Sequence, residues 1–240
     1  VIMVEAKVIS SLEKVMLTDD FDSFETVKTL NAARGERTSF QVVIKNAKLG
    51  SMSELKMSVR SKLLGSISTA RVGHVPSEMP AYLERSDDDY ITKKPGLFPD
   101  VLYPVKRTDI VRSDRYYPDT LWFTVDVPSD TQPGDYPVCI TFTDIKDETK
   151  TKVRVVVSVK NAVIEKSDLI FTQWFHCDSI ADYFGVKMMS ERHWRLIEQF
   201  IKTAARTGIT MLLTPLFTPP LDTAVGTERP TMQLVRVVKT

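Results

Sequence analysis

The sequence predicts a mainly β protein: an antiparallel β-sandwich, immunoglobulin-like or jelly-roll-like, followed by the first βαβ unit of a TIM-type (β/α) barrel. Three observations support this. Short alternating or β-branched segments without a convincing helix fill about the first 165 residues. A strand, helix, strand pattern then occupies Asp168–Pro220. The chain ends at Thr240, whereas such a barrel needs about eight units and about 250 residues. We therefore expect a sandwich domain at 1–165 and a truncated barrel at 166–240.

The sandwich strands are predicted from alternation with period two and from β-branched and aromatic residues. The strongest segments are Val4–Val8, Thr38–Asn46, Leu55–Ser61, Leu121–Pro128, Tyr136–Asp144 and Thr151–Lys160. Pro133-Gly134 suits the central positions of a type II turn, and a polar loop precedes the last segment. These two short connections predict that the last three strands form an antiparallel meander.

The segment Met79–Tyr103 interrupts this pattern with three prolines and the acidic run Asp87-Asp88-Asp89. It is predicted to be a long excursion between strands. We expect the acidic run to be solvated. A calcium site is the alternative, although no further oxygen ligands follow at a recognisable spacing.

The barrel start is predicted as a strand DLIFTQWF, a long loop HCDSIADYFGVKMM, a helix, and a strand ITMLL. Ser190 suits the N-cap of the helix, and Gly208 suits a left-handed position at its end. The continuous apolar run ITMLL is typical of a parallel strand that is buried on both faces. Strand, helix and strand in this order predict a right-handed parallel crossover.

Candidate functional residues follow the two predicted barrel strands, because active sites of such barrels lie at the C-terminal strand ends. They are Trp174, His176 and Asp178 after the first strand and Thr214 after the second. An aromatic ring beside a histidine and an aspartate suits a sugar. The alternative is that Trp174 packs at the barrel mouth and His176 caps a loop. We assign no catalytic residue and no cofactor. Consecutive residues tend to point apart, which disfavours both a metal site and a Cys177–His176 nucleophile.

The composition argues against several function classes. The net charge of +1 and the interspersed charges give no reason to expect nucleic acid as a partner. No apolar stretch approaches the roughly 20 residues of a membrane helix. The N-terminus lacks the features of a signal peptide, so we expect a cytoplasmic location, with secretion of a longer parent as the alternative. The cysteines, Cys139 and Cys177, do not resemble a disulfide framework.

Several motifs resemble a known family. TQWFHCDSIADYFGV and the stretch that continues to Val235 are similar to the opening of the catalytic barrel in proteins with domain of unknown function 4091. Those proteins are similar to glycoside hydrolase family 123, the N-acetyl-β-galactosaminidases. ARGERTSFQVVIKN, PGLFPDVLYP and LWFTVDVPSDTQPGDYPVCITF resemble the sandwich strands of that family. The resemblance spans most of the chain, and Phe175–Val235 is its most specific part.

The resemblance implies a sandwich and a TIM-like barrel that hydrolyses amino sugars with help from the substrate's own acetamido group, an exception to the two-carboxylate scheme. The family's catalytic pair is an adjacent Asp-Glu on a later barrel strand. The only such step here is Asp147-Glu148, in a predicted hairpin turn of the sandwich. We therefore expect the N-terminal portion of a glycoside hydrolase for N-acetylhexosamine-containing glycans, inactive as a fragment.

Two other functions stay as alternatives. The sandwich could be a carbohydrate-binding module, which requires exposed aromatic residues on one face. Tyr116 and Tyr117 are adjacent, and adjacent residues of a regular strand cannot both face outward, which argues against it. The chain could instead be a structural or assembly module. In that case apolar strands such as ITMLL, without their barrel neighbours, would drive self-association.

Overall fold

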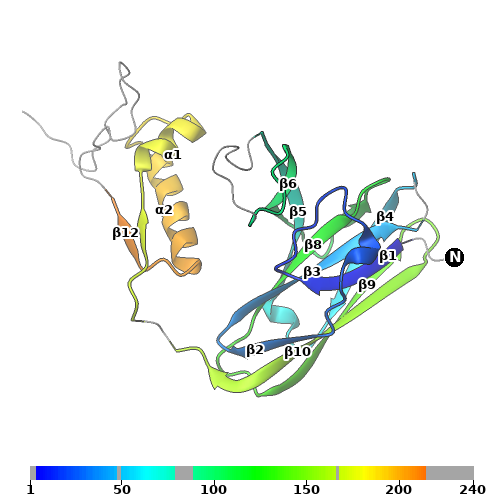
Figure 1. The fold of residues 1–240 in the computed structure, drawn as a ribbon. Coiled ribbons are helices and arrows are strands. Elements are labelled where there is room, and N and C mark those ends of the chain that lie inside the picture. Colours follow the sequence, from blue (N-terminus) through cyan, green and yellow to red (C-terminus); the bar gives the residue numbers. More distant parts are fainter. Residues whose placement is uncertain (1–3, 48–49, 79–88, 166–167, 215–240) are drawn as a thin grey trace, which may run out of the picture. The chain divides into compact units, whose positions relative to one another are not determined.

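The computed structural model describes residues 4–47, 50–78, 89–165 and 168–214. The chain divides into two compact units, Val1–Glu165 and Lys166–Thr240. The first is a β-sandwich, and the second contains a parallel strand pair with two helices (Figure 1). The predicted fold class, a mainly β chain with a sandwich followed by the start of a barrel, is confirmed.

The sandwich consists of two five-stranded sheets. The first has the order β1-β3-β8-β5-β6, with bounds Val4–Ser10, Arg37–Asn46, Asp119–Asp126, Ile67–Ser77 and Gly96–Pro104. The second has the order β2-β10-β9-β4-β7, with bounds Thr29–Arg34, Lys150–Val163, Gly134–Asp144, Ser53–Arg60 and Ile110–Ser113. Short 3₁₀ turns lie at Phe21–Ser23 and Leu64–Ser66. All strand pairs in the two sheets are antiparallel except β2 with β10.

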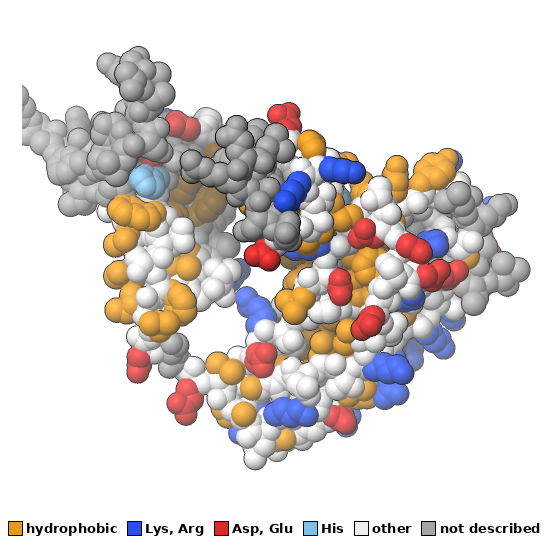
Figure 2. Space-filling model, viewed as in Figure 1, with side chains coloured by type: hydrophobic (Ala, Val, Ile, Leu, Met, Phe, Trp, Pro, Cys, Tyr) orange, Lys and Arg blue, Asp and Glu red, His pale blue; other side chains and the backbone are white. Residues whose placement is uncertain are grey.

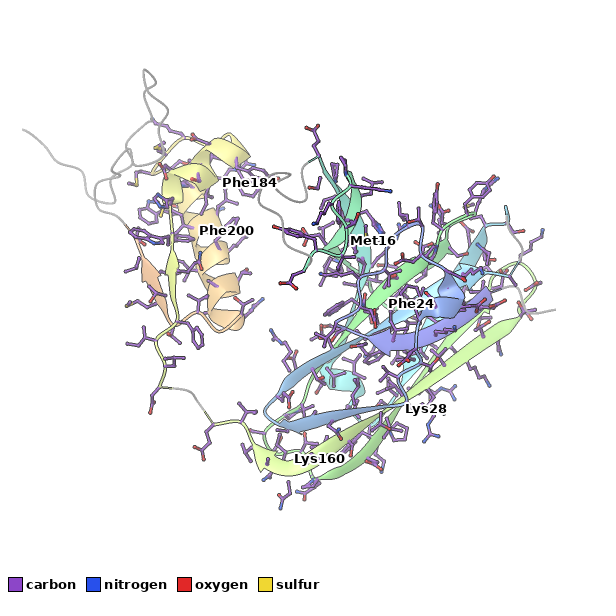
Figure 3. All side chains as sticks on the ribbon, viewed as in Figure 1. Met16, Phe24, Lys28, Lys160, Phe184 and Phe200 are labelled. Carbon is purple, nitrogen blue, oxygen red and sulfur yellow. The ribbon has the colours of Figure 1, made fainter. Side chains whose placement is uncertain are left out.

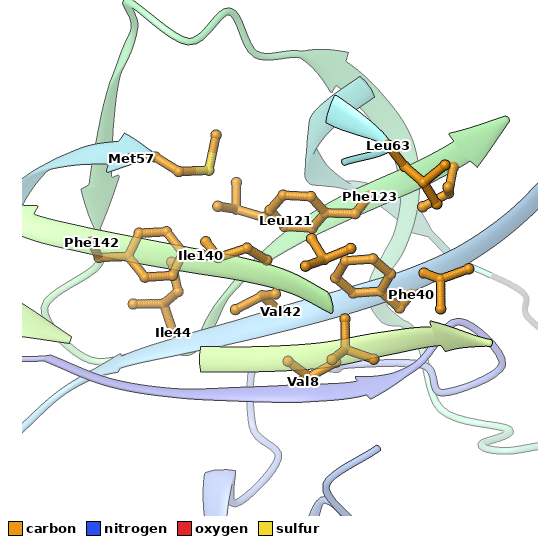
Figure 4. Packing of buried hydrophobic residues seen from close by; sticks show 14 of the residues in the cluster. Val8, Phe40, Val42, Ile44, Met57, Leu63, Leu121, Phe123, Ile140 and Phe142 are labelled. Atoms are coloured by element: carbon orange, nitrogen blue, oxygen red, sulfur yellow. The ribbon is translucent and has the colours of Figure 1, made fainter. Parts of the chain in front are cut away.

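The core of the sandwich forms where alternate residues of the two sheets meet. Phe40 of β3 and Phe123 of β8 are paired in the ladder, and their rings stack at 5.0 Å between centroids. Ile140 and Phe142 of β9 come from the opposite sheet and belong to the same buried cluster (Figure 4). The alternation seen in the sequence therefore identifies the inward face of each strand.

The predicted meander of the last three sandwich strands is wrong in part. β9 and β10 do form an antiparallel hairpin, with Tyr136 opposite Val157. However, β8 pairs with β3 and β5 in the first sheet, while β9 lies in the second. The connection through Pro133 thus crosses from one sheet to the other. Turn residues indicate only that the chain reverses, and a sandwich offers two sheets for the returning strand.

The excursion predicted at Met79–Tyr103 is also wrong in part, because it contains β6. This strand pairs with β5 from Ser77 opposite Gly96 to Ala70 opposite Pro104. It lies at the edge of the first sheet, the position where proline such as Pro99 is tolerated in a strand. The ladder shifts register between Val72 and His74. Of the acidic run, Asp87 and Asp88 lie outside the described residues.

Asp119, the first residue of β8, fixes the turn that precedes the strand. Its carboxylate accepts hydrogen bonds from the backbone N–H of Asp114 and from Arg71 Nη2, the latter at 3.1 Å. Burial raises the pKa of the Asp119 carboxyl, and the Asp114 N–H and the Arg71 guanidinium oppose this rise. The ion pair with Arg71 therefore makes the charged form of Asp119 tolerable inside the fold.

The second unit is built on β11 (Thr172–Trp174) and β12 (Met211–Leu213), which pair in parallel. Between them lie α1 (Cys177–Phe184) and α2 (Glu191–Arg206). The Phe184 ring of α1 meets the Phe200 ring of α2 edge to face (Figure 3). Ser190 caps α2 and Gly208 has φ +95°, as predicted. Among the described residues, no helix combines the length and apolarity that crossing a bilayer requires.

The segment after β11 was predicted to be a loop, but it contains α1. The predicted strand Asp168–Phe175 is correspondingly reduced to the three residues of β11. Asp178 in the first turn favours this helix, and Gly185, in the left-handed conformation, ends it. A helix of only eight residues gives a weak periodic pattern in the sequence. The acidic residue in its first turn and the glycine that ends it were the stronger indications of a helix.

His193 connects the two helices and is completely buried. Its Nδ1 accepts a hydrogen bond from the Met189 N–H at 3.0 Å, and its Nε2 donates to the Cys177 carbonyl at 2.9 Å. The first bond holds Met189 at φ +58°, an uncommon conformation for a side-chain-bearing residue. The second fixes the first turn of α1 against α2. The small apolar cluster of this unit, Cys177, Ile180 and Ile197, lies between the same helices.

Replacing His193 with leucine should destabilise the second unit by about 2 kcal/mol, because the buried Cys177 carbonyl and the partly buried Met189 N–H lose their partner while the volume is nearly kept. Hydrogen exchange of the Met189 and Cys177 regions and urea unfolding measure the effect. Arg192→Ala, a change at the exposed neighbouring residue, is the matched control. Unchanged protection in His193→Leu would mean that packing alone holds α1 in place.

Replacing Arg71 with methionine should destabilise the sandwich by about 1 kcal/mol at pH 7, a modest value because Arg71 is half exposed. Without the guanidinium, the pKa of Asp119 rises further, so the deficit appears as pH increases through that pKa and disappears in acid. Urea unfolding at pH 7 and pH 4 measures the difference. A deficit that is equal at both pH values would contradict an electrostatic role.

Candidate functional site

The parallel pairing of β11 and β12 defines the edge where the predicted site residues gather. Trp174 lies opposite Leu213 in the ladder, and the Phe175 N–H donates to the Leu213 carbonyl at 2.9 Å. Trp174, the last residue of β11, and Thr214, the residue after β12, therefore lie at the same C-terminal edge. Thr214 is half-buried and is the last residue described. The remainder of the predicted pattern Asp168–Pro220 lies outside the described residues.

Trp174 and His176 form the most distinctive pair at this edge. Their rings lie nearly parallel, with 6.1 Å between centroids and an interplanar angle of 26°. The Trp174 side chain is 63% exposed and offers an open ring. His176 occupies the N-cap position of α1 but makes no side-chain cap hydrogen bond. Its Nδ1 is buried and has no hydrogen-bond partner among the described residues. The alternative prediction, a histidine that caps a loop, is therefore not supported.

Asp178 lies in the first turn of α1 and is buried. Its Oδ1 accepts a hydrogen bond from the Ser179 N–H at 3.1 Å. A carboxylate in the first turn also interacts favourably with the helix dipole. The three candidate residues Trp174, His176 and Asp178 therefore lie where β11 ends and α1 begins. Asp178 is the most buried of the three.

Cys177 does not have the properties of a nucleophile. It is buried between the helices, and its backbone carbonyl is held by His193. Burial raises the pKa of its thiol, and the neighbouring Asp178 carboxylate raises it further. Because the thiolate is the reactive form, this environment makes the sulfur unreactive. Both cysteines are free, and within the described ranges no group of three or more His, Cys, Asp or Glu side chains could hold a metal ion.

Neither the helix that carries the site nor the histidine that holds it is evident from the sequence. His193 is buried and packs between the two helices. Its third position in α2, following the cap Ser190, lets it reach back to the start of α1. No sequence pattern indicates this contact, because it joins residues that are 16 positions apart. The Asp178 and Gly185 capping signals could have revealed α1.

One family model matches the second unit: residues 174–240 match the model of the glycoside hydrolase 123 catalytic domain. The fold resembles that of a family 123 glycoside hydrolase from Clostridium perfringens, which is described for its hydrolysis of glycolipid glycans. That similarity has a TM-score of 0.68 and 16% identity, and it covers 87% of this chain. It covers 37% of the Clostridium perfringens chain, so this chain spans little more than a third of that enzyme.

Two further structures match part of the chain with low overall similarity. The N-terminal domain of PorA covers 66% of this chain and 99% of its own, with 12% identity and a TM-score of 0.32. A FixG-related protein from Vibrio parahaemolyticus covers 67% of this chain and 99% of its own, with 12% identity and a TM-score of 0.30. No curated protein matches the sequence. The comparisons therefore show that residues 174–240 are similar to a glycoside hydrolase 123 catalytic domain and that the fold resembles that of a family 123 glycoside hydrolase.

Proposed function

We propose that this chain is the N-terminal portion of a glycoside hydrolase that removes β-linked N-acetylgalactosamine or a related N-acetylhexosamine. The observation that carries the proposal is the match of residues 174–240 to a family 123 catalytic domain, which begins at the open tryptophan of the candidate site. The fold similarity to the Clostridium perfringens enzyme supports the same reading of the architecture.

The candidate site has chemistry that suits a sugar. The exposed Trp174 ring can cover the apolar C–H face of a pyranose, as aromatic side chains do when they bury a ring-shaped ligand. The half-buried His176 imidazole, which lies beside the Trp174 ring, can exchange a hydrogen bond with a sugar hydroxyl. Asp178, held in the first turn of α1, and Thr214, across the strand pair, provide further polar groups at the same edge.

The catalytic carboxylates are proposed to lie outside the described chain. In substrate-assisted hydrolysis, the acetamido oxygen attacks the anomeric carbon while a glutamic acid protonates the leaving oxygen. The adjacent Asp147-Glu148 step belongs to the sandwich, and the Asp147 carboxylate is engaged by hydrogen bonds from the Thr149 side chain and backbone. The step lies in the exposed turn between β9 and β10.

The exposed apolar surface of the second unit is relevant to which molecules the chain binds. Figure 2 shows many hydrophobic side chains on its visible face. The exposed apolar residues on and before its strands, apart from the tryptophan of the candidate site, include Leu169, Ile170, Phe171, Met211 and Leu213. Patches of this kind favour association. We propose that the intact protein covers them with the rest of its barrel and binds a carbohydrate substrate, while the chain alone associates with itself through them.

Hydrolysis of 4-nitrophenyl N-acetyl-β-galactosaminide should occur with a longer protein that contains the whole barrel, and should be absent with residues 1–240. Release of 4-nitrophenol measures both reactions side by side. Activity in residues 1–240 would overturn the proposed division. Inactivity of the longer protein towards galactosaminide and glucosaminide substrates alike would overturn the proposed substrate class.

Replacing Trp174 with alanine in the longer protein should lower kcat/KM roughly tenfold, since a lost ring contact of about 1.4 kcal/mol corresponds to that factor. The loss should fall mainly on KM, because the ring is proposed to bind the sugar before and during reaction. Trp194→Ala, at another partly exposed tryptophan of the same unit, is the matched control and should leave kcat/KM unchanged. Equal losses in both variants would indicate a general structural effect.

A further inference from the structure

A polar cavity lies in the sandwich, and all of its lining residues belong to the first unit. Its volume is about 230 Å³. The residues that give it its chemistry are Arg71, His74, Tyr103, Asp114, Tyr117 and Asp119. Drug-sized ligands occupy roughly 300–1,000 Å³, so this cavity suits a smaller molecule. Strands β5, β6 and β8, which form much of its wall, are neighbours in the first sheet (Figure 1).

The cavity arises where the inward face of the sheet changes from apolar to polar. Arg71 lies opposite Leu121 of β8 and opposite Tyr103 of β6 in the two ladders. Residues paired in this way share a face, and Leu121 belongs to the apolar core. The inward row therefore passes from Leu121 to Arg71 and Tyr103. A cation at such a position is tolerated because Asp119 accepts its hydrogen bond.

Two of the residues that line this cavity are exposed tyrosines. Tyr117 is 45% exposed and Tyr103 is 58% exposed. Tyr116 and Tyr117 are both exposed, because they lie in a turn, where the alternation of faces in a regular strand does not hold. Asp114 Oδ1 holds this turn by accepting hydrogen bonds from the N–H groups of both tyrosines. Their exposed rings are therefore a fixed feature of the sandwich surface.

Gly73 positions the other ring. A methyl group at this residue would lie 2.5 Å from the Tyr103 ring and 2.7 Å from the Val101 side chain. Asp100 and Val101 of β6 occupy the register shift opposite Gly73, which is the arrangement of a β-bulge. The absence of a side chain at Gly73 thus allows the Tyr103 ring to lie against the backbone at the cavity. Bulges are used in this way to redirect side chains.

His74 contributes a polar atom without a partner. Its Nε2 is buried and makes no hydrogen bond to any described residue. A buried polar group without a hydrogen bond is costly, and an ordered water or ion is one way in which native folds satisfy it. His74 lines the cavity together with the two tyrosines and the Arg71–Asp119 pair, so aromatic rings, donors and acceptors border one small space.

We propose that this cavity binds a single neutral sugar ring, as a glycan-binding site of the sandwich separate from the catalytic unit. An open tyrosine ring covers an apolar sugar face, and paired groups such as Arg71 and Asp119 match neighbouring hydroxyls. The cavity is lined by the carboxylates of Asp114 and Asp119 and by the guanidinium of Arg71. The excess of negative charge disfavours an anionic ligand. This site does not depend on the proposed hydrolase activity.

The larger cavity of the same unit fits this role less well. It has a volume of about 450 Å³ and is bordered by Tyr90, Ile91 and Phe98 together with Asp100. None of the buried polar atoms without a partner belongs to its lining in the described part of the chain. It nevertheless provides an internal control, because Tyr90 is an exposed tyrosine of the same domain outside the proposed site.

Saturation-transfer NMR on the 240-residue chain with galactose, N-acetylgalactosamine and glucose tests the proposal. At least one sugar should bind, and Tyr117→Ala should weaken its binding roughly five- to tenfold. Tyr117→Phe should retain most of the affinity because it keeps the ring. Gly73→Ala should weaken binding as well, since the new methyl group displaces the Tyr103 ring.

Matched controls locate the site. Tyr90→Ala should bind the sugar as the unaltered chain does, and circular dichroism should show that every variant is folded. The proposal is overturned if none of the three sugars binds. It is equally overturned if Tyr117→Ala leaves binding unchanged while Tyr90→Ala removes it, which would place the sugar in the larger cavity.

Discussion

The buried layer between the two sheets is the constraint on which the rest of the sandwich depends. Phe40 and Phe123 stack within one sheet, and Ile140 and Phe142 pack against that sheet from the other. Because side chains alternate along a strand, this layer determines which residues must face outward or towards the sheet ends. The polar row at Arg71 and Tyr103 can exist only because the apolar layer stops before it. Binding surfaces on this domain are therefore set by the extent of its core.

The fold class could be predicted from the sequence because alternation and apolar runs are local signals. β3, with its run Phe40–Ile44, was recognised within one residue of its bounds. The partner of each strand was not predictable in the same way. β9 follows β8 after a short turn yet joins the other sheet, and β6 was hidden by its prolines at the sheet edge. Pairing depends on contacts between distant residues, which a single sequence does not display.

The candidate site shows the same division between local and distant information. Trp174 and Thr214 could be placed at one edge because parallel strands bring their C-terminal ends together. The role of His193 could not be predicted, since its two hydrogen bonds reach the first residue of an unpredicted helix and a residue after that helix. In the second unit the site residues are thus held by a connection between helices, whereas the strand pair itself is only three residues long.

The parallel ladder between β2 and β10 has a mechanical consequence. β10 is the last strand of the sandwich, and its ladder continues to the Ile164 N–H, which donates to the Arg34 carbonyl at 2.8 Å. Tension applied to the chain beyond Glu165 would enter the domain along the axis of β10. Its hydrogen bonds to β2 and to β9 would then be loaded in shear and would share the load, instead of opening one after another. A pull directed along β10 is therefore resisted by two ladders at once.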